Sequence, residues 1–184
     1  MSSILTCNRL VVVAARTLTT PTLAASQYAP FSDSQRPFMG WVGFPTAKQE
    51  NAHDCGYACV RILASYHGLS EVEYPPLPET HLSIEDVLKF AAKAGFSGHA
   101  FRTSYSWLLE KVPTPFIVHW KGEHFVVVHR IDTTRVGMSD PATGTLVELT
   151  KQEFVQGWLG AIRGPGAWKR GVVVFLEKNL PHDQ

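Results

Sequence analysis

Residues 49–68 read QENAHDCGYACVRILASYHG, and this stretch carries more information about the fold than any other. A cysteine in the first turn of a helix has its thiolate stabilised by free backbone N–H groups and by the helix dipole. Such a position lowers a thiol pKa from about 8.5 to roughly 3.5–7.5. The stretch therefore predicts a reactive thiolate at Cys55, with Gly56 leaving room beside the sulfur for a substrate backbone. A buried, inert cysteine is the alternative. The predicted helix begins at Cys55, and its buried face would hold the apolar residues Tyr57, Ala58, Val60, Leu63 and Ala64.

Residues 115–132, PFIVHWKGEHFVVVHRID, predict a β-hairpin. The first strand lies around Phe116–Trp120, Lys121–Gly122 form a tight turn, and the second strand runs from Phe125 to Ile131. Both strands are apolar, and the second is rich in β-branched residues.

The hairpin carries three histidines, His119, His124 and His129. Period-two alternation places His124 on one strand face and His129 on the other. Because His124 lies beside the turn, its side chain can extend from the strand end into a cleft. A structural role is the alternative for each histidine. The face of His124 also holds Val126 and Val128, and the face of His129 holds Phe125 and Val127.

Asp140 follows His124 by sixteen residues, in the segment VGMSDPATG. Val136–Ser139 is predicted to be a short strand, and Asp-Pro followed by Gly144 predicts a turn. On adjacent antiparallel strands, Asp140 would accept a hydrogen bond from one ring nitrogen of His124. The other nitrogen would then exchange a proton with Cys55. A turn-capping aspartate is the alternative.

These three motifs together resemble the bacteriocin-processing cysteine peptidases, which belong to the papain-like superfamily and cut leader peptides after a double glycine. The similarity spans roughly residues 45–177. The resemblance implies that Cys55 is the nucleophile, His124 the general base and acid, and Asp140 its orienting partner. The matching pieces are Gln49 with Asp54-Cys55-Gly56 and Ala58, then His124-Phe125-Val126-Val127, then Asp140-Pro141 with Gly144.

Gln49 resembles the side-chain donor of the oxyanion hole in these peptidases. Acyl transfer places negative charge on the carbonyl oxygen, and a positioned amide N–H stabilises that charge. A glutamine six residues before the nucleophile can fold back beside the sulfur, with the Cys55 backbone N–H as the second donor. A solvent-exposed loop glutamine is the alternative.

The other segments predict three helices and two strands. A helix opens with a capping-box pattern at Ser83 and extends to about Lys93. The sequence thus predicts an α+β fold. The resemblance implies a papain-like cysteine peptidase fold, with an N-terminal helical half packed on a C-terminal antiparallel β-sheet. The remaining predicted elements are short helices over 105–110 and 150–158 and strands over 145–149 and 171–177.

The sequence divides into three parts of different composition. Residues 1–40 are predicted to be an extension and linker, either flexible or a weak targeting segment, because they are poor in acidic residues and their apolar run is short. Residues 41–178 are the predicted peptidase domain, and 179–184 a polar tail.

Composition excludes several classes of function. The chain has 184 residues, a net charge of +1 and 45% hydrophobic residues, so there is no electrostatic case for binding nucleic acid. No apolar run approaches the roughly 20 residues of a membrane helix, which argues against an integral membrane protein. Three cysteines, at 7, 55 and 59, do not form a disulfide framework. A metal site at His53, Cys55, Cys59 and His67 is disfavoured because the second Cys/His pair of a zinc finger is missing.

The leading hypothesis is a cytoplasmic cysteine peptidase, without cofactor, that removes a double-glycine leader from a small secreted peptide. Its expected partners are that leader peptide and a peptide-exporting ABC transporter. Two alternatives stay open. One is a papain-like transferase or deamidase with the same triad, and the other is a non-catalytic module that binds a leader for an exporter.

Overall fold

The computed structural model describes residues 43–69, 73, 75–160 and 170–179. The predicted N-terminal extension over 1–40 lies outside the described residues, as does the tail beyond Asn179. The predicted domain limits at 41 and 178 stay predictions. Within the described residues the elements are α1 (Cys55–Tyr66), α2 (Ile84–Lys93), β1 (Phe96–Thr103), α3 (Tyr105–Lys111), β2 (Phe116–Trp120), β3 (His124–Ile131), β4 (Arg135–Asp140), β5 (Thr145–Thr150), α4 (Lys151–Gly160) and β6 (Gly171–Lys178).

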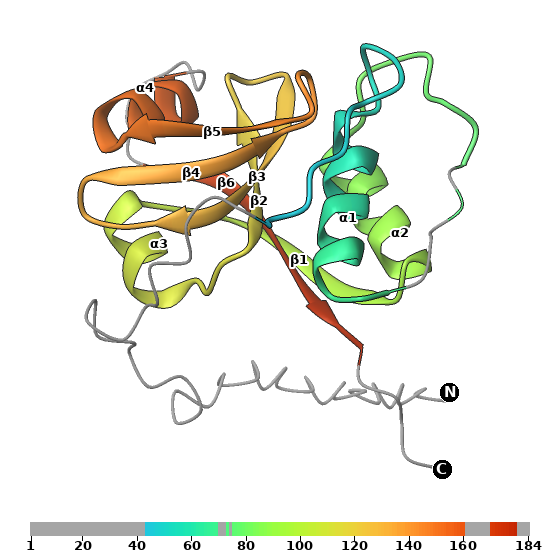
Figure 1. The fold of residues 1–184 in the computed structure, drawn as a ribbon, viewed down its shortest axis with the longest axis horizontal. Coiled ribbons are helices and arrows are strands. Elements are labelled where there is room, and N and C mark those ends of the chain that lie inside the picture. Colours follow the sequence, from blue (N-terminus) through green and yellow to red (C-terminus); the bar gives the residue numbers. More distant parts are fainter. Residues whose placement is uncertain (1–42, 70–72, 74, 161–169, 180–184) are drawn as a thin grey trace, which may run out of the picture. The chain divides into compact units, whose positions relative to one another are not determined.

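The strands form one six-stranded antiparallel sheet in the order β1-β6-β2-β3-β4-β5. Strands β2 to β5 follow one another by short connections, whereas β6 returns to lie between β1 and β2 (Figure 1). The α+β arrangement predicted from the sequence is confirmed, with N-terminal helices packed on an antiparallel sheet.

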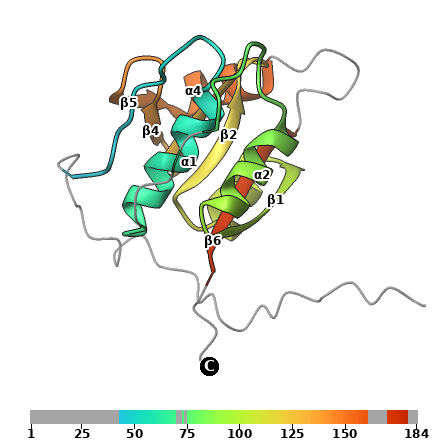
Figure 2. The same cartoon turned by 90° about the vertical axis from the view of Figure 1, so that its right-hand side faces the viewer.

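In the described part of the chain, two helices cover each face of the sheet. Helices α1 and α2 lie on one face (Figures 1 and 2), and α3 and α4 lie on the other (Figure 1). Phe125 and Val127 of β3 belong to the core under α1 and α2, whereas Val126 and Val128 belong to the core under α3 and α4. The alternation predicted for this strand is therefore confirmed over these four residues.

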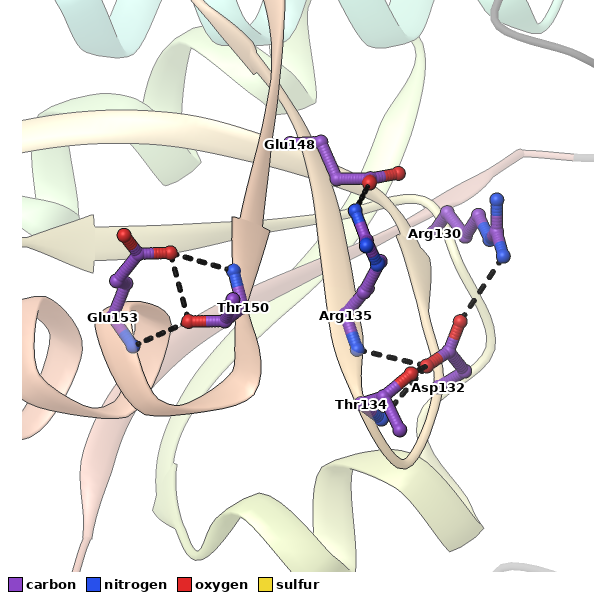
Figure 3. A network of polar contacts seen from close by, with 7 residues as sticks. All are labelled: Arg130, Asp132, Thr134, Arg135, Glu148, Thr150 and Glu153. Carbon is purple, nitrogen blue, oxygen red and sulfur yellow. Dashed lines mark hydrogen bonds and ion pairs between the residues drawn. The ribbon is translucent and has the colours of Figure 1, made fainter.

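Local side-chain contacts explain where α2 and α4 begin. Ser83 and Asp86 form a reciprocal capping box at the start of α2, as predicted. Thr150 and Glu153 make the same exchange at the start of α4, which Figure 3 shows beside a polar network on the β3–β4 turn. In that turn the Asp132 carboxylate accepts the backbone N–H groups of Thr134 and of Arg135, the first residue of β4.

Strand β1 was not predicted. It is the edge strand, and six of its eight residues are at least partly exposed, so neither face has the apolar alternation that identifies a strand. Gly98 lies in the middle of β1. A Cβ at this position would lie 2.4 Å from a methyl group of Leu176 on β6, and glycine avoids that clash. The sheet therefore begins before α3, and the helices and strands are not separated along the chain as the sequence pattern indicated.

Candidate active site

Cys55 is the first residue of α1, and 3% of it is exposed. The first hydrogen bond of the helix runs from the N–H of Ala58 to the carbonyl of Asp54, at 3.0 Å. The N–H groups of the first turn therefore lie outside the helical ladder, at the positive end of the helix dipole. Cys59 is fully buried one turn later, and both cysteines are free thiols. Burial, together with the negative charges of Cys55 and Asp140, raises the pKa of Cys59 well above its usual value.

His124 and Asp140 lie together at the ends of neighbouring strands. Nε2 of His124 is 2.8 Å from Oδ1 of Asp140. The register of the strands produces this pairing, because Val127 of β3 lies opposite Ser139 of β4. The N–H of Ala142 also donates to Oδ1 of Asp140, at 2.9 Å, so the turn after β4 holds the carboxylate in place.

The imidazole of His124 lies against the Asp140 carboxylate, and its pKa also responds to Cys55. Burial lowers the pKa of His124, but hydrogen bonds to Asp140 and Cys55 and the negative charges of both groups outweigh burial and raise it to about 9. The hydrogen bond to His124 is the largest cause of the lowered pKa of Asp140. Since Nε2 is bound to Asp140, Nδ1 is the ring nitrogen left for the thiol. The raised pKa favours an imidazolium at His124 near neutral pH.

Gln49 lies on the loop before α1 and contacts the turn after Asp140. Its backbone N–H donates to the carbonyl of Pro141 at 2.9 Å, and Lys48 packs on Gly144 of the same turn. The side-chain Nε2 donates to the carbonyl of Asn51 at 2.6 Å. An amide nitrogen carries two N–H groups, so a second donor remains for a substrate oxygen. The loop therefore connects the start of α1 to the strand end that carries Asp140.

Asp54 is a residue to which the sequence analysis gave no role. An aspartate just before a helix normally caps it, but this side chain makes no cap hydrogen bond. Its carboxylate is fully buried and accepts the backbone N–H groups of Glu50 and Asn51, at 2.9 and 3.0 Å. Only the three-dimensional path of the loop reveals this use of Asp54.

The other two histidines of the hairpin lie in different surroundings. His129 stacks on Phe44 with ring centroids 4.7 Å apart. Its ring packs against Gly137, where a Cβ would lie 2.8 Å from the imidazole. Burial and the nearby Arg130 charge lower the pKa of His129 to about 4. His119 lies against Phe125, and its pKa is lowered by burial and by the charges of His124 and Arg102. Both histidines are therefore neutral near neutral pH, unlike His124.

Gly56 does not leave room beside the sulfur, so that expectation is wrong. A Cβ at this position would lie 2.5 Å from Val87 of α2, 3.2 Å from Leu82 and 3.3 Å from Phe125 of β3. The space is filled by neighbouring side chains. Gly56 instead allows α1 to approach α2 and the sheet closely, which fixes the position of the adjacent Cys55.

The described ranges hold no group of three or more His, Cys, Asp or Glu side chains able to bind a metal ion. In those same ranges no helix is long and apolar enough to cross a membrane.

Comparison with known proteins extends these observations. A model of the peptidase C39 family matches residues 43–162. Over 129 residues, 64% of this chain, the sequence is 30% identical to the lactococcin-G-processing and transport ATP-binding protein LagD of Lactococcus lactis subsp. lactis. Over 123 residues, 62% of this chain, it is 28% identical to the lacticin-481/lactococcin-DR transport/processing ATP-binding protein lcnDR3 of the same organism. The chain spans 18% of the length of each of these curated relatives.

Two similar solved structures share the fold. One is a double glycine motif protease from an AMS/PCAT transporter in complex with the leader peptide, with a TM-score of 0.59 and 22% identity, covering 77% of this chain and 96% of that one. The other is the peptidase domain of Streptococcus ComA, a bi-functional ABC transporter involved in a quorum sensing pathway, with a TM-score of 0.60 and 20% identity, covering 74% and 100%. At these identities the likeness concerns the fold.

Proposed function

This chain belongs to the peptidase C39 family of cysteine peptidases, and from that premise we propose that Cys55, His124 and Asp140 are its catalytic triad and that Gln49 supplies the oxyanion donor. The observation that carries the proposal is the placement of the His124 ring. One nitrogen lies 2.8 Å from the Asp140 carboxylate, and the influence of Asp140 and Cys55 raises the pKa of His124. A nucleophile, a base and an orienting acid in this order are the elements of covalent acyl transfer.

In the proposed reaction the Cys55 thiolate attacks the carbonyl carbon of the scissile peptide bond. The negative charge moves to the carbonyl oxygen, where the second N–H of the Gln49 amide and the Cys55 backbone N–H would stabilise it. The His124 imidazolium then donates its proton to the departing amine, and a thioester to Cys55 remains. Neutral His124 takes a proton from water, and the hydroxide attacks the thioester. Expulsion of the Cys55 thiolate then releases the acid and regenerates the thiolate–imidazolium pair.

Asp140 keeps the His124 ring oriented throughout this cycle. It accepts from Nε2, which leaves Nδ1 directed at the sulfur and then at the leaving amine. Its negative charge also stabilises the imidazolium. The Asp140 carboxylate therefore does not need to take up a proton during the reaction.

We propose that the substrate is a precursor peptide with a double-glycine leader, and that cleavage separates the leader from a small secreted peptide. The family match and the relatives named for lactococcin and lacticin processing support this substrate class. We also propose that the chain works with a peptide exporter, since both relatives are named as transport ATP-binding proteins. Removal of a leader before export would take place in the cytoplasm.

Cleavage of a fluorogenic peptide with a Gly-Gly cut site tests this function. Cys55→Ala is expected to abolish turnover and to keep the fold, because the thiol does the chemistry. Iodoacetamide is expected to label Cys55 in the wild-type protein near neutral pH, and the Cys55→Ala protein is the labelling control. A leader-binding module without activity predicts peptide binding with no turnover in either protein, and that result would refute the proposal.

A further inference from the structure

We propose that Asp54 is a positioning residue that fixes the Gln49 amide for the oxyanion. The inference rests on the oxyanion role proposed above for Gln49 and deepens it. Asp54 adjoins the nucleophile, yet its carboxylate is directed toward the preceding loop and makes no bond to the start of α1.

The buried carboxylate of Asp54 holds two backbone N–H groups of the loop. Each of its oxygens accepts one backbone N–H, from Glu50 at 2.9 Å and from Asn51 at 3.0 Å. These two residues directly follow Gln49 in the chain. Because a carboxylate binds both N–H groups at once, the peptide planes after Gln49 have little freedom to rotate.

The Gln49 amide is bonded to the same loop that Asp54 holds. The carbonyl of Asn51 accepts the Nε2 of Gln49 at 2.6 Å, and the N–H of this same Asn51 is one of the two bound by Asp54. The direction in which Gln49 presents its second N–H therefore depends on the orientation of the peptide groups that Asp54 fixes. A rotation of that segment would move the donor away from the position of the oxyanion.

The loop is held from other sides as well. The Oδ1 atom of Asn51 accepts the N–H groups of His53 and Asp54, at 2.7 and 3.1 Å, and its Nδ2 donates to the carbonyl of Pro78 at 3.1 Å. With the bond from Gln49 to Pro141, the loop is fixed at both ends and in its middle. Such a complete set of contacts fits a loop whose function needs accurate placement.

The test uses the full chain and two readouts. Alkylation of Cys55 by iodoacetamide displaces iodide from a saturated carbon, so it develops no oxyanion and reports only the thiol and His124. Cleavage of the fluorogenic Gly-Gly peptide requires the oxyanion donor as well. Asp54→Asn is expected to lower kcat by about 10- to 100-fold. This loss is not expected to exceed the roughly 10²–10³-fold loss expected for Gln49→Ala. KM and the alkylation rate are expected to stay near the wild-type values.

Two further variants make the result specific. Asn51→Ala loosens the same loop and keeps the buried carboxylate, so the same split between kcat and alkylation is expected. Asp132→Ala is the matched control, since it removes a carboxylate that also accepts two backbone N–H groups. His124 begins β3, and Asp132 follows the other end of the same strand. Loss of the Asp132 carboxylate is expected to lower thermal stability and to leave kcat unchanged.

The double variant Gln49→Ala/Asp54→Asn completes the cycle. If Asp54 acts through Gln49, the double variant is no slower than Gln49→Ala alone. Losses that multiply would overturn the proposal, as would alkylation that slows in proportion to kcat in Asp54→Asn and Asn51→Ala. Full activity of Gln49→Ala would instead overturn the oxyanion role on which the proposal rests. A loss in Gln49→Ala with none in Asp54→Asn or Asn51→Ala would overturn the positioning role alone.

Discussion

Replacing Asp140 separates the two ways in which it acts on His124. Asp140→Asn keeps an oxygen that can accept a hydrogen bond from Nε2 but removes the negative charge. Asp140→Ala removes both. The wild-type hydrogen bond is 2.8 Å long, and both side chains are less than a quarter exposed, at 20% and 24%, so solvent screens the interaction only in part.

The structure sets the size of the effect. The pKa of His124 is about 9 against an ordinary 6.5, and this difference of about 2.5 corresponds to roughly 3 kcal/mol in favour of the imidazolium at about 1.36 kcal/mol for each unit of pKa. Asp140 and Cys55 share this effect, so Asp140→Ala is expected to lower the pKa of His124 by about 1–2. With a pKa of about 8 in place of about 9, the imidazolium fraction at pH 8 falls from about 90% to about 50%.

This loss of imidazolium slows cleavage only about twofold at pH 8, so a larger loss must come from the orientation of the ring. General acid–base catalysis contributes about 10²–10⁴-fold, and a freely rotating imidazole forfeits part of it. We expect kcat to fall about 10²-fold in Asp140→Ala and about 10-fold in Asp140→Asn.

The assay is the pH profile of kcat/KM for the Gly-Gly peptide. The alkaline limb reports loss of the proton that His124 gives to the leaving amine, so it is expected near pH 9 in the wild type and lower by about 1–2 in Asp140→Ala. Asp132→Ala is again the control, with an unchanged limb. An alkaline limb that stays near pH 9 in Asp140→Ala would refute the assignment of Asp140.

The same pair gives a stability prediction with a definite sign. The raised pKa of His124 means that its contribution to folding is complete below about pH 6.5 and is lost as the pH rises through about 9. The lowered pKa of Asp140 means that its contribution is present above its ordinary pKa of 3.8 and is lost as the pH falls through the lower folded value. The difference in Tm between wild type and Asp140→Ala is therefore expected to be largest between about pH 4 and 6.5.

Two further predictions concern α1. Gly56→Ala places a Cβ 2.5 Å from a methyl group of Val87, a stiff β-branched side chain, so urea unfolding is expected to show a loss of about 1–3 kcal/mol in the free energy of unfolding. An unchanged midpoint would show that α1 and α2 can separate without cost. Because burial raises the pKa of Cys59, iodoacetamide at pH 8 is expected to label Cys55 much faster than Cys59, as mass spectrometry of the peptides can measure. Equal rates would contradict an activated Cys55.

The elements around the proposed triad were predictable because each has a strong local pattern. Helix α1 follows from apolar spacing after Cys55, and the β2–β3 hairpin from two apolar runs separated by Lys121 and Gly122. The proximity of His124 and Asp140 follows from simple pairing of adjacent strands, and in the structure Val127 lies opposite Ser139.

What the sequence could not predict depends on contacts between distant segments. Strand β1 is an exposed edge strand, and its pairing with β6 holds it in the extended conformation. The real use of Gly56 is visible only when Val87 lies beside it. The buried contacts of Asp54 depend on the path of a loop, which periodicity does not describe.

The hydrogen bond from Gln49 to Pro141 joins residues 92 positions apart, since 141 − 49 = 92. Contacts of such long range form late in folding, because a large loop must close before they contribute. A growing chain that has already produced the helix of Cys55 still has no partner for the Gln49 loop and no aspartate for His124. The proposed site is therefore incomplete until strand β4 and the turn after it have been synthesised and paired with the rest of the sheet.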